Sequence, residues 1–321
     1  MNTPVAFPGS PDVIVVGEAL IDMVVSTGGV TEHPGGSPAN VAYGLARLGI
    51  DTGFLTALGR DDRGDAIRAH LNGAGVETVS ESRSIDATST AKATLGRDGS
   101  ASYSFDVTWP LAPVTLTHQP KVLHTGSIAS FLAPGAASVR GLIEDCKAAA
   151  TITYDPNIRP ELLGSHQEAL AIFEDLVPLT DVVKLSDEDA DWLYPRQAIE
   201  TTTRHLLGLG TKLVVVTQGA GGSLLKTPEY QISVPGVPSV VADTIGAGDS
   251  YMAAFILGLL TKDIYGWTPD VLENVGRMAS AAAAITVRRP GANPPSGNEL
   301  RDFLASPTMA AISDGKNRHT L

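Results

Sequence analysis

The sequence has very little cysteine, no excess of positive charge and no long hydrophobic run. The single cysteine in 321 residues, Cys146, excludes an internal disulfide and any cysteine-based zinc cluster. The formal net charge of −12 argues against a broad surface for nucleic acid or for an anionic membrane. No apolar run reaches transmembrane length, and residues 1–11 lack a charged-then-apolar leader. We therefore expect a soluble, cytoplasmic protein.

Several familiar nucleotide and catalytic motifs are also missing. There is no G-x-x-x-x-G-K-[ST] loop, and the absence of an early strand–G-x-G-x-x-G–helix unit counts against a dinucleotide-binding oxidoreductase. Residues 218–223 are rich in glycine, but their spacing does not match that fingerprint. No H-E-x-x-H or G-x-S-x-G run occurs, and the seven histidines show no metal-ligand spacing. We interpret His124 and His205 as structural or surface residues.

The chain alternates strand-like and helix-like segments, and its hydrophobic content of 43% supports a sizeable core. Such alternation predicts an α/β fold with a mostly parallel central sheet and helices on both faces. The expected strands are residues 12–17, 53–58, 121–125, 151–155, 181–185 and 212–217, and the expected helices include 38–48, 62–74, 136–149 and 248–260.

Two stretches, at about residues 21–26 and 89–108, alternate polar and apolar residues instead. Alternation is typical of strands with one face in water, so we predict a small lid sheet inserted between the early units of the main domain. An ordinary edge hairpin is the alternative. Residues 1–11 and 306–321 are polar and unpatterned, and we expect both to be mobile.

The most informative stretch is Asp243-Thr244-Ile245-Gly246-Ala247-Gly248-Asp249-Ser250, at the start of a predicted helix. Backbone N–H groups at a helix start are unsatisfied and carry partial positive charge. The small residues 246–248 allow a phosphate to approach that backbone, and Asp249 adds a carboxylate beside it. A carboxylate there suits removal of a proton from an attacking hydroxyl, which indicates phosphoryl transfer. The alternative is a glycine turn capped by an aspartate.

A second glycine pair, Gly35 and Gly36, precedes another predicted helix. Asn40, on the first turn of that helix, can donate to and accept from hydroxyl groups, and Asp22 is an acceptor suited to a diol. All four residues are expected near the carboxyl ends of strands, where open α/β sheets bind ligands. The alternative is a simple turn with Pro38 at a favoured first-turn position.

Taken together, these motifs resemble the ribokinase-like sugar kinases of the phosphofructokinase-B type, over residues 12–304. The matching blocks occur in family order: residues 35–49 with 59–64, then 155–160, 184–189, 217–222 and 243–249. The resemblance implies one ribokinase-like kinase domain over this range, with the predicted lid strands inserted in it. Residues 17–22 and 155–160 look most like the fructokinase and 2-keto-3-deoxygluconate kinase branch.

The resemblance also implies roles for individual positions. Asp249 matches the catalytic base, and Gly246, Ala247 and Gly248 match an anion hole of backbone amides. Arg159 matches a basic position near the transferred phosphate. The remaining matches are three groups of ligand-binding positions. The sugar-binding positions are Asp22, Gly35, Gly36 and Asn40, and the nucleotide-binding positions are Lys184, Thr217, Gly219, Gly222 and Asn274. The positions near a monovalent cation such as K⁺ are Asp243, Ile245 and Gly291.

The chain departs from the family pattern at a few positions. The Asn-x-x-Glu element, which helps to organise Mg²⁺ and phosphate through water, is Ser186-Asp187-Glu188-Asp189 here. Asp189 is expected to reach metal-bound water rather than the metal itself. Tyr251 stands where the family often has phenylalanine, and Arg288 and Arg289 add positive charge that we interpret as a solvated turn.

The resemblance therefore implies a Mg²⁺- and ATP-dependent kinase for a primary hydroxyl of a small sugar, with fructose favoured. A 2-keto-3-deoxygluconate kinase, a ribokinase or a nucleoside kinase is the alternative within the family, and a non-catalytic sugar or nucleotide sensor is the alternative outside it. Phe105 and Trp109 offer rings that can stack on a sugar, or a core role instead. We also expect a homodimer formed through the lid sheets.

Overall fold

The computed structural model describes residues 2–26, 29–79, 82, 84–95, 101–261 and 267–316. Its strands are β1 (Thr3–Val5), β2 (Val13–Val16), β3 (Leu20–Ser26), β4 (Gly29–Gly35), β5 (Thr52–Leu55), β6 (Glu77–Thr78), β7 (Thr90–Leu95), β8 (Ala101–Asp106), β9 (Val114–Leu116), β10 (Val122–Gly126), β11 (Thr151–Asp155), β12 (Val182–Ser186), β13 (Leu213–Thr217), β14 (Ser223–Lys226) and β15 (Gln231–Val234). Its helices are α1 (Ser37–Arg47), α2 (Asp62–Gly73), α3 (Gly135–Cys146), α4 (His166–Leu176), α5 (Asp187–Leu193), α6 (Ile199–Leu209), α7 (Ala247–Leu260), α8 (Pro269–Thr286), α9 (Gly297–Leu304) and α10 (Pro307–Lys316).

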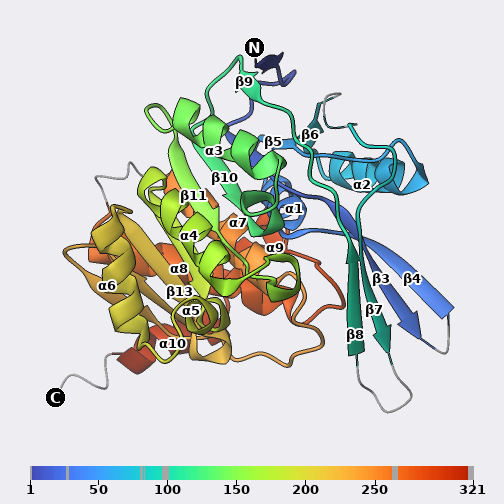
Figure 1. Cartoon of the computed structure of the whole chain (residues 1–321). Helices are drawn as coiled ribbons and strands as arrows, with labels where there is room; N and C mark the ends of the chain where they lie inside the picture. The colour runs from blue at the N-terminus through green and yellow to red at the C-terminus, as the bar shows by residue number, and fades with distance from the viewer. Residues whose placement is uncertain are drawn as a thin grey trace.

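A nine-stranded sheet forms the centre of the molecule, in the order β15-β14-β13-β12-β11-β10-β2-β5-β6 (Figure 1). The pairs from β13 through β6 are parallel, and only β14 and β15 join antiparallel. The strands β2, β10 and β5 are buried along their whole length, as expected for a sheet covered on both faces. The predicted α/β class is confirmed.

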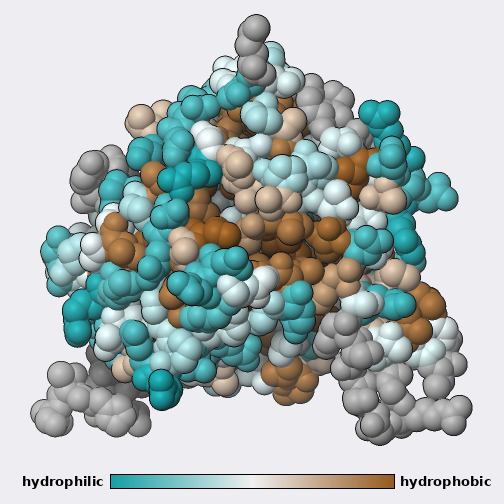
Figure 2. Space-filling model, in the orientation of Figure 1, coloured by the Kyte–Doolittle hydropathy of each residue, from teal (hydrophilic) through white to brown (hydrophobic). Residues whose placement is uncertain are grey.

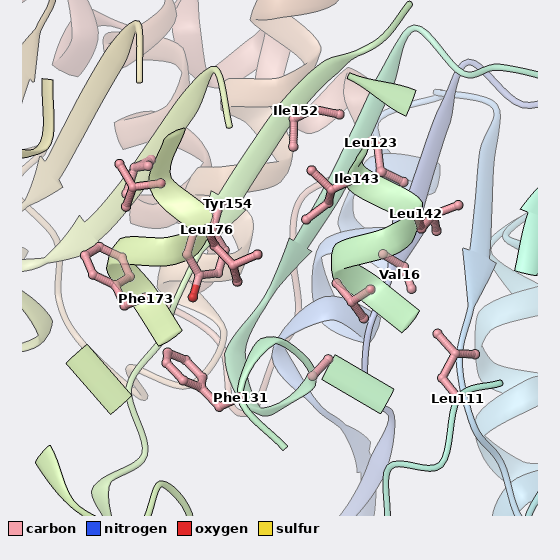
Figure 3. Close-up of a cluster of buried hydrophobic side chains, with 14 of the residues drawn as sticks. Val16, Leu111, Leu123, Phe131, Leu142, Ile143, Ile152, Tyr154, Phe173 and Leu176 are labelled. Carbon is pink, nitrogen blue, oxygen red and sulfur yellow. The ribbon is translucent and has the colours of Figure 1, made fainter. Parts of the chain in front are cut away.

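Successive residues of each strand pack on opposite faces of the sheet, because side chains alternate along a strand. On one face, Val16, Leu123, Ile152 and Tyr154 of the sheet point toward Leu142 and Ile143 of α3 and Phe173 and Leu176 of α4 (Figure 3). On the other face, Val13 and Val15 pack with residues of α1 and α7. Helix α7 is apolar nearly all round because it is buried between this face and α8.

The strand order reverses beside β2, since the chain continues from β2 to β5 on one side and to β10 on the other. Ligands of open α/β sheets bind outside the carboxyl ends of the strands at such a reversal. The segments that follow β2, β10, β11, β12 and β13 all leave the sheet at this edge.

The strands β4-β3-β7-β8 form a separate sheet, which we call the lid, and it extends away from the main body (Figure 1). In the predicted stretch 89–108, residues 96–100 lie outside the described residues. Strand β4 was not predicted, because its residues from Gly29 to His33 are all exposed and show no alternation. Helix α2 packs behind the lid, where Arg63 contacts Glu32 and the sulfur of Met23.

Both ends of the chain form structure that the sequence pattern did not predict. Strand β1 pairs with β9, and Val5 and Phe7 are buried in the core. At the other end, α10 buries Met309. These few apolar side chains hold segments whose overall composition is polar; residues 1 and 317–321 lie outside the described residues. In the described ranges, no helix has both the length and the apolar character needed to cross a membrane.

Candidate active site

The start of α7 leaves backbone amides available to a ligand. Gly246, the residue before the helix, has a left-handed φ of 73°, and a β-carbon there would lie 2.7 Å from Cβ of Ala292. Glycine is therefore required both by the turn and by the close packing. In the part of the chain that the structure describes, no group accepts a hydrogen bond from the amides of Gly248 and Asp249. These donors, at the positive end of the helix, form a potential anion site.

The carboxylate of Asp249 lies on this first turn and is held by helix α1. The Ser37 hydroxyl donates to Oδ1 at 2.6 Å, and Nδ2 of Asn40 donates to Oδ2 at 2.8 Å. Burial raises the pKa of Asp249, while these two hydrogen bonds and the charges of Lys184 and Arg159 oppose the rise. The result is a carboxylate of increased basicity that is fixed in orientation.

Gly36 allows α1 to begin directly after the lid strand β4. Its φ is 99°, and a β-carbon would lie 2.8 Å from the carbonyl oxygen of Glu18. This close approach brings Ser37 and Asn40, on the first turn of α1, to Asp249 from more than two hundred residues away. Gly35 is restricted by a side chain only, because a β-carbon there would overlap the carboxylate of Asp22.

A buried ion pair lies beside the start of α7. Lys184, on β12, donates to Oδ2 of Asp155 at the end of β11, at 2.8 Å, and both side chains are almost fully buried. A β-carbon on Gly248 would lie 3.1 Å from the Lys184 ammonium, so the charge is next to the amides of the anion site. Burial lowers the pKa of Lys184, but the carboxylates of Asp155, Asp189 and Asp249 raise it further, so the ammonium stays charged.

Asp189 uses both carboxylate oxygens to hold backbone. Oδ2 accepts from the amide of Ser186 in a capping box, and Oδ1 accepts from the amide of Ile158 at 2.8 Å. The following residue, Arg159, is exposed, and its nearest polar contact is its donation to the Ile158 carbonyl at 2.8 Å. Arg159 contributes to the pKa of Asp22, Glu18 and Asp249, so its charge acts on the same region.

Asp22 brings the lid to this site. Burial and the charge of Asp249 raise the pKa of Asp22 to about 6, and Arg159 and His33 oppose the rise. The effect of the Asp249 charge on the pKa of Asp22 indicates that Asp22 lies near Asp249. On the face drawn in Figure 2, apolar residues gather at the centre, where the body meets the lid strands of Figure 1, and hydrophilic residues surround them.

The residues predicted for a monovalent cation are also together. Oδ1 of Asp243 accepts from the amide of Ile245 at 3.0 Å, and Oδ2 accepts from the amide of Gly291 at 2.8 Å. The carboxylate thus connects the loop before α7 to the loop after α8. Arg288 and Arg289 turn away from this loop toward Ser239 and Glu299, as expected for a solvated turn.

Among the predicted nucleotide residues, three are close together at the end of β13. The Thr217 hydroxyl donates to the Leu185 carbonyl, and Gly219 and Gly222 take φ values of 51° and 95° in the turn that follows. This turn is connected to α7, because the buried Tyr251 hydroxyl donates to the Ser223 hydroxyl at 2.9 Å. Asn274 is exposed on α8, twelve residues before Thr286, or about 18 Å along the helix. Since Thr286 contacts Ser250 on the first turn of α7, Asn274, which the resemblance implies to be near the adenine, lies away from the anion site.

The two aromatic residues predicted to contact sugar differ in their surroundings. Phe105 is half-buried on β8, in the same row of the lid as Ala91 and Asp22. Trp109 is only 1% exposed, and its indole N–H donates to the Ala129 carbonyl at 3.0 Å. The prediction that Trp109 stacks on a sugar is therefore wrong, because the protein core covers the ring.

Three polar residues of the site were not singled out from the sequence. Ser37 lies within the early glycine motif, and Asp155 ends a predicted strand at the ligand-binding edge, so both carried a usable signal. Glu18 is 3% exposed, and burial raises its pKa to about 7. Its environment could not be read from a sequence in which a glutamate simply follows a strand.

Comparison with known proteins agrees with this geometry. A family model described as pfkB family carbohydrate kinase matches residues 10–298. The chain is 31% identical over 259 residues to a fructokinase of Rhizobium leguminosarum bv. trifolii, covering 77% of this chain and 79% of the relative. A structure of a double mutant of fructokinase from Vibrio cholerae O395, with fructose, ADP and potassium ion bound, superposes with a TM-score of 0.80 at 28% identity, covering 91% of this chain and 97% of that one. Aminoimidazole riboside kinase from Salmonella enterica, complexed with its riboside and an ATP analog, gives a TM-score of 0.78 at 27% identity, covering 91% and 99%.

Proposed function

The chain belongs to the pfkB family of carbohydrate kinases, and we propose that it transfers the γ-phosphoryl group of ATP to a primary hydroxyl of fructose. That the protein is a sugar kinase follows from the family. The choice of fructose is supported by the fructokinases among its relatives and by the fructose in the similar structure. The observation that carries the chemistry is the Asp249 carboxylate, held on the same helical turn as two amides that lack an acceptor among the described residues.

In this proposal Asp249 is the general base. It accepts the proton of the sugar hydroxyl as the oxygen attacks the γ-phosphorus, and the bond from that phosphorus to the ADP oxygen breaks. The hydrogen bonds from Ser37 and Asn40 keep the carboxylate in one orientation, which matters because a base must be within hydrogen-bonding reach of its proton. Its raised pKa increases its ability to take that proton.

The negative charge of the transferred group is stabilised by groups that are already in place. The amides of Gly248 and Asp249 point out of the helix start, and Lys184 adds a full positive charge beside Gly248. Arg159, exposed at the same edge, is free to offer its forked donors to phosphate oxygens. The anion hole predicted at Gly246, Ala247 and Gly248 needs a correction at Ala247, because its amide donates to the Thr244 carbonyl. We assign Gly246 and Ala247 the role of shaping this turn.

The carboxylates of Asp155, Asp189 and Asp243 suit the predicted magnesium and monovalent cations. When bound, a magnesium ion would supply positive charge that neutralises the nucleotide phosphates. Oδ1 of Asp155 is buried with no hydrogen-bond partner among the described residues, which suits a water carried by such an ion. Asp189 keeps a lone pair on each oxygen for a similar water, and Asp243 with the loops of Ile245 and Gly291 is the proposed monovalent cation site.

The sugar is proposed to lie between the lid and α1. Asp22, Gly35, Gly36 and Asn40 border this space, and Phe105 lies in the same lid row as Asp22. Lid closure would exclude water, because water would otherwise compete for the phosphoryl group. The nucleotide is assigned to the turn of Thr217, Gly219 and Gly222, with Lys184 on its phosphates. Asn274, on α8, is assigned to the adenine end of the nucleotide.

The lid is also the proposed dimer interface. Val30 is 55% exposed on the lid, and its cross-strand partner Val25 on β3 is half-buried. A small sheet with uncovered apolar residues is stabilised when a second copy covers it.

The proposed function is tested by ADP release with ATP, Mg²⁺ and K⁺ against fructose, 2-keto-3-deoxygluconate, ribose and a riboside. We expect the highest kcat/KM with fructose. A higher value with another sugar would refute the choice of fructose but retain the kinase. Sugar binding without any ADP formation would refute catalysis and favour a sensor.

A further inference from the structure

Two stretches of chain that connect the lid to the body converge on a single residue, Ala129. One is the segment that enters β3, and the other is the segment that leaves β8. The Ala129 amide donates to Oε2 of Glu18 at 3.0 Å, and its carbonyl accepts from the indole of Trp109 at 3.0 Å. The backbone hydrogen-bonding groups of Ala129 are thus both used to hold the lid.

The backbone of Ala129 is held rigidly against the central sheet. It lies in a buried 3-10 turn (Ser127–Ser130) that directly follows β10, and it is itself fully buried. The Ser130 hydroxyl contacts the Tyr154 hydroxyl on β11 at 3.0 Å and donates to the Ser127 carbonyl. The turn is therefore attached to the carboxyl edge of the sheet, next to Asp155.

The two contacts are placed symmetrically with respect to the sugar-facing row of the lid. Asp22 follows Glu18 by four residues, and Phe105 precedes Trp109 by four residues. Asp22 pairs with Ala91 on β7, and Ala91 pairs with Phe105 on β8, so the three lie in one row across the lid. Each end of the row is thus connected by a short extended segment to the same backbone unit.

Both side chains are isolated from water, which makes their hydrogen bonds hard to replace. Glu18 is 3% exposed, and its buried carboxyl is held by hydrogen bonds from the amide of Ala129, the hydroxyl of Ser127 and its own backbone amide. Trp109 carries one donor, and removal of that donor leaves the Ala129 carbonyl without its partner. Loss of a buried partner costs more than loss of a solvated one.

We propose that Glu18 and Trp109 are positioning residues, which fix Asp22 and Phe105 over the sugar by holding both lid connections to the backbone of Ala129. The proposal rests on the sugar kinase function proposed above. Neither residue touches the reacting atoms, and each acts through the lid strand that it anchors.

The test compares Glu18→Ala, Glu18→Gln and Trp109→Phe with wild type. The first and third remove one contact to Ala129, and Glu18→Gln keeps an acceptor oxygen. We expect KM for the sugar to rise by about tenfold in Glu18→Ala and Trp109→Phe, the value of one lost buried hydrogen bond, with KM for ATP unchanged. ADP formed per sugar phosphate should rise above one, because a poorly placed lid admits water. Glu18→Gln should restore wild-type values.

Ser138→Ala is the matched control, since the Ser138 hydroxyl donates to the buried Leu111 carbonyl just beyond Trp109 without holding a lid strand. It should lose stability but keep wild-type KM values. Amide hydrogen exchange gives a readout apart from activity: β3 and β8 should exchange faster in Glu18→Ala and Trp109→Phe than in wild type. Wild-type KM and exchange in folded Glu18→Ala would overturn the inference. Wild-type protein that is inactive on every sugar would instead overturn the proposed function.

Discussion

The substitution Gly246→Ala tests whether the turn before α7 is as tightly determined as its geometry indicates. Gly246 has φ of 73°, where an L-residue with a β-carbon is disfavoured. The added β-carbon would lie 2.7 Å from Cβ and 2.8 Å from Cα of Ala292. Because one of these atoms is backbone, the turn or the loop of Ala292 has to move.

The two effects can be estimated separately. The left-handed conformation costs about 1–2 kcal/mol for alanine, and forcing an extra methyl group into a packed site costs about 1–3 kcal/mol. We therefore expect the free energy of unfolding to fall by about 3 kcal/mol in urea titrations. Gly291→Ala isolates the first effect, since Gly291 has φ of 68° but no atom within 4 Å of the added carbon. Gly141→Ala, in α3 with the same open space, should stabilise by about 0.5–1 kcal/mol.

The same movement should displace the amides of Gly248 and Asp249. Loss of one such donor costs about 10²–10³ in turnover in other enzymes, so kcat of folded Gly246→Ala should fall by about 10²-fold. The assay is ADP release at saturating sugar and ATP. A variant with wild-type stability and turnover would refute the assignment of this turn as a close-packed anion site.

Three further predictions concern the ion pair, Glu18 and the lid. Lys184→Met leaves Asp155 buried without its partner and should lower the free energy of unfolding in urea by about 3–5 kcal/mol. The double variant Lys184→Met/Asp155→Asn should recover part of this loss, and a double variant as unstable as Lys184→Met would contradict the pairing. Burial raises the pKa of Glu18 from 4.5 to about 7, so native protein binds the extra proton and loses stability as pH rises between these values. Glu18→Gln removes this pH dependence of stability. The stability of Glu18→Gln relative to wild type should increase by up to about 3 kcal/mol from pH 4.5 to 7 and then stay constant. A stability difference that does not change with pH would refute the raised pKa of Glu18. Sedimentation at assay concentration should give a dimer that Val30→Asp dissociates, and a wild-type monomer would contradict the proposed interface.

The central layers of the fold were predictable because local pattern and tertiary environment agree there. The run at Val13–Val16 is continuous and apolar, as a buried parallel strand requires. Helix α2 has an N-cap side chain, Asp61, that accepts from the amide of Gly64, and such a signal is visible in sequence. Strand β4 was missed because its exposed residues are defined by pairing with β3 rather than by their own hydropathy.

The site was predictable in its glycines and acids, but not in its contacts. Gly36 and Gly246 predicted tight turns, and in the structure both residues have positive φ values, which only glycine adopts easily. The bond from Ser37 to Asp249 joins residues 212 positions apart, so no local pattern could supply it. Trp109 could not be assigned from the sequence, because an aromatic residue near a lid can either stack on a ligand or pack in the core. Only the burial of its side chain in the structure distinguishes these two roles.

The most direct measurement of the central claim is the turnover of Asp249→Asn, with ATP binding followed by calorimetry in the same samples. Loss of a general base should lower kcat by about 10²–10⁴-fold while the ATP dissociation constant stays near the wild-type value. Ser250→Ala is the matched control, since its hydroxyl contacts only Thr286 in the described structure and its turnover should be almost unchanged. Wild-type turnover in purified, folded Asp249→Asn would contradict the account.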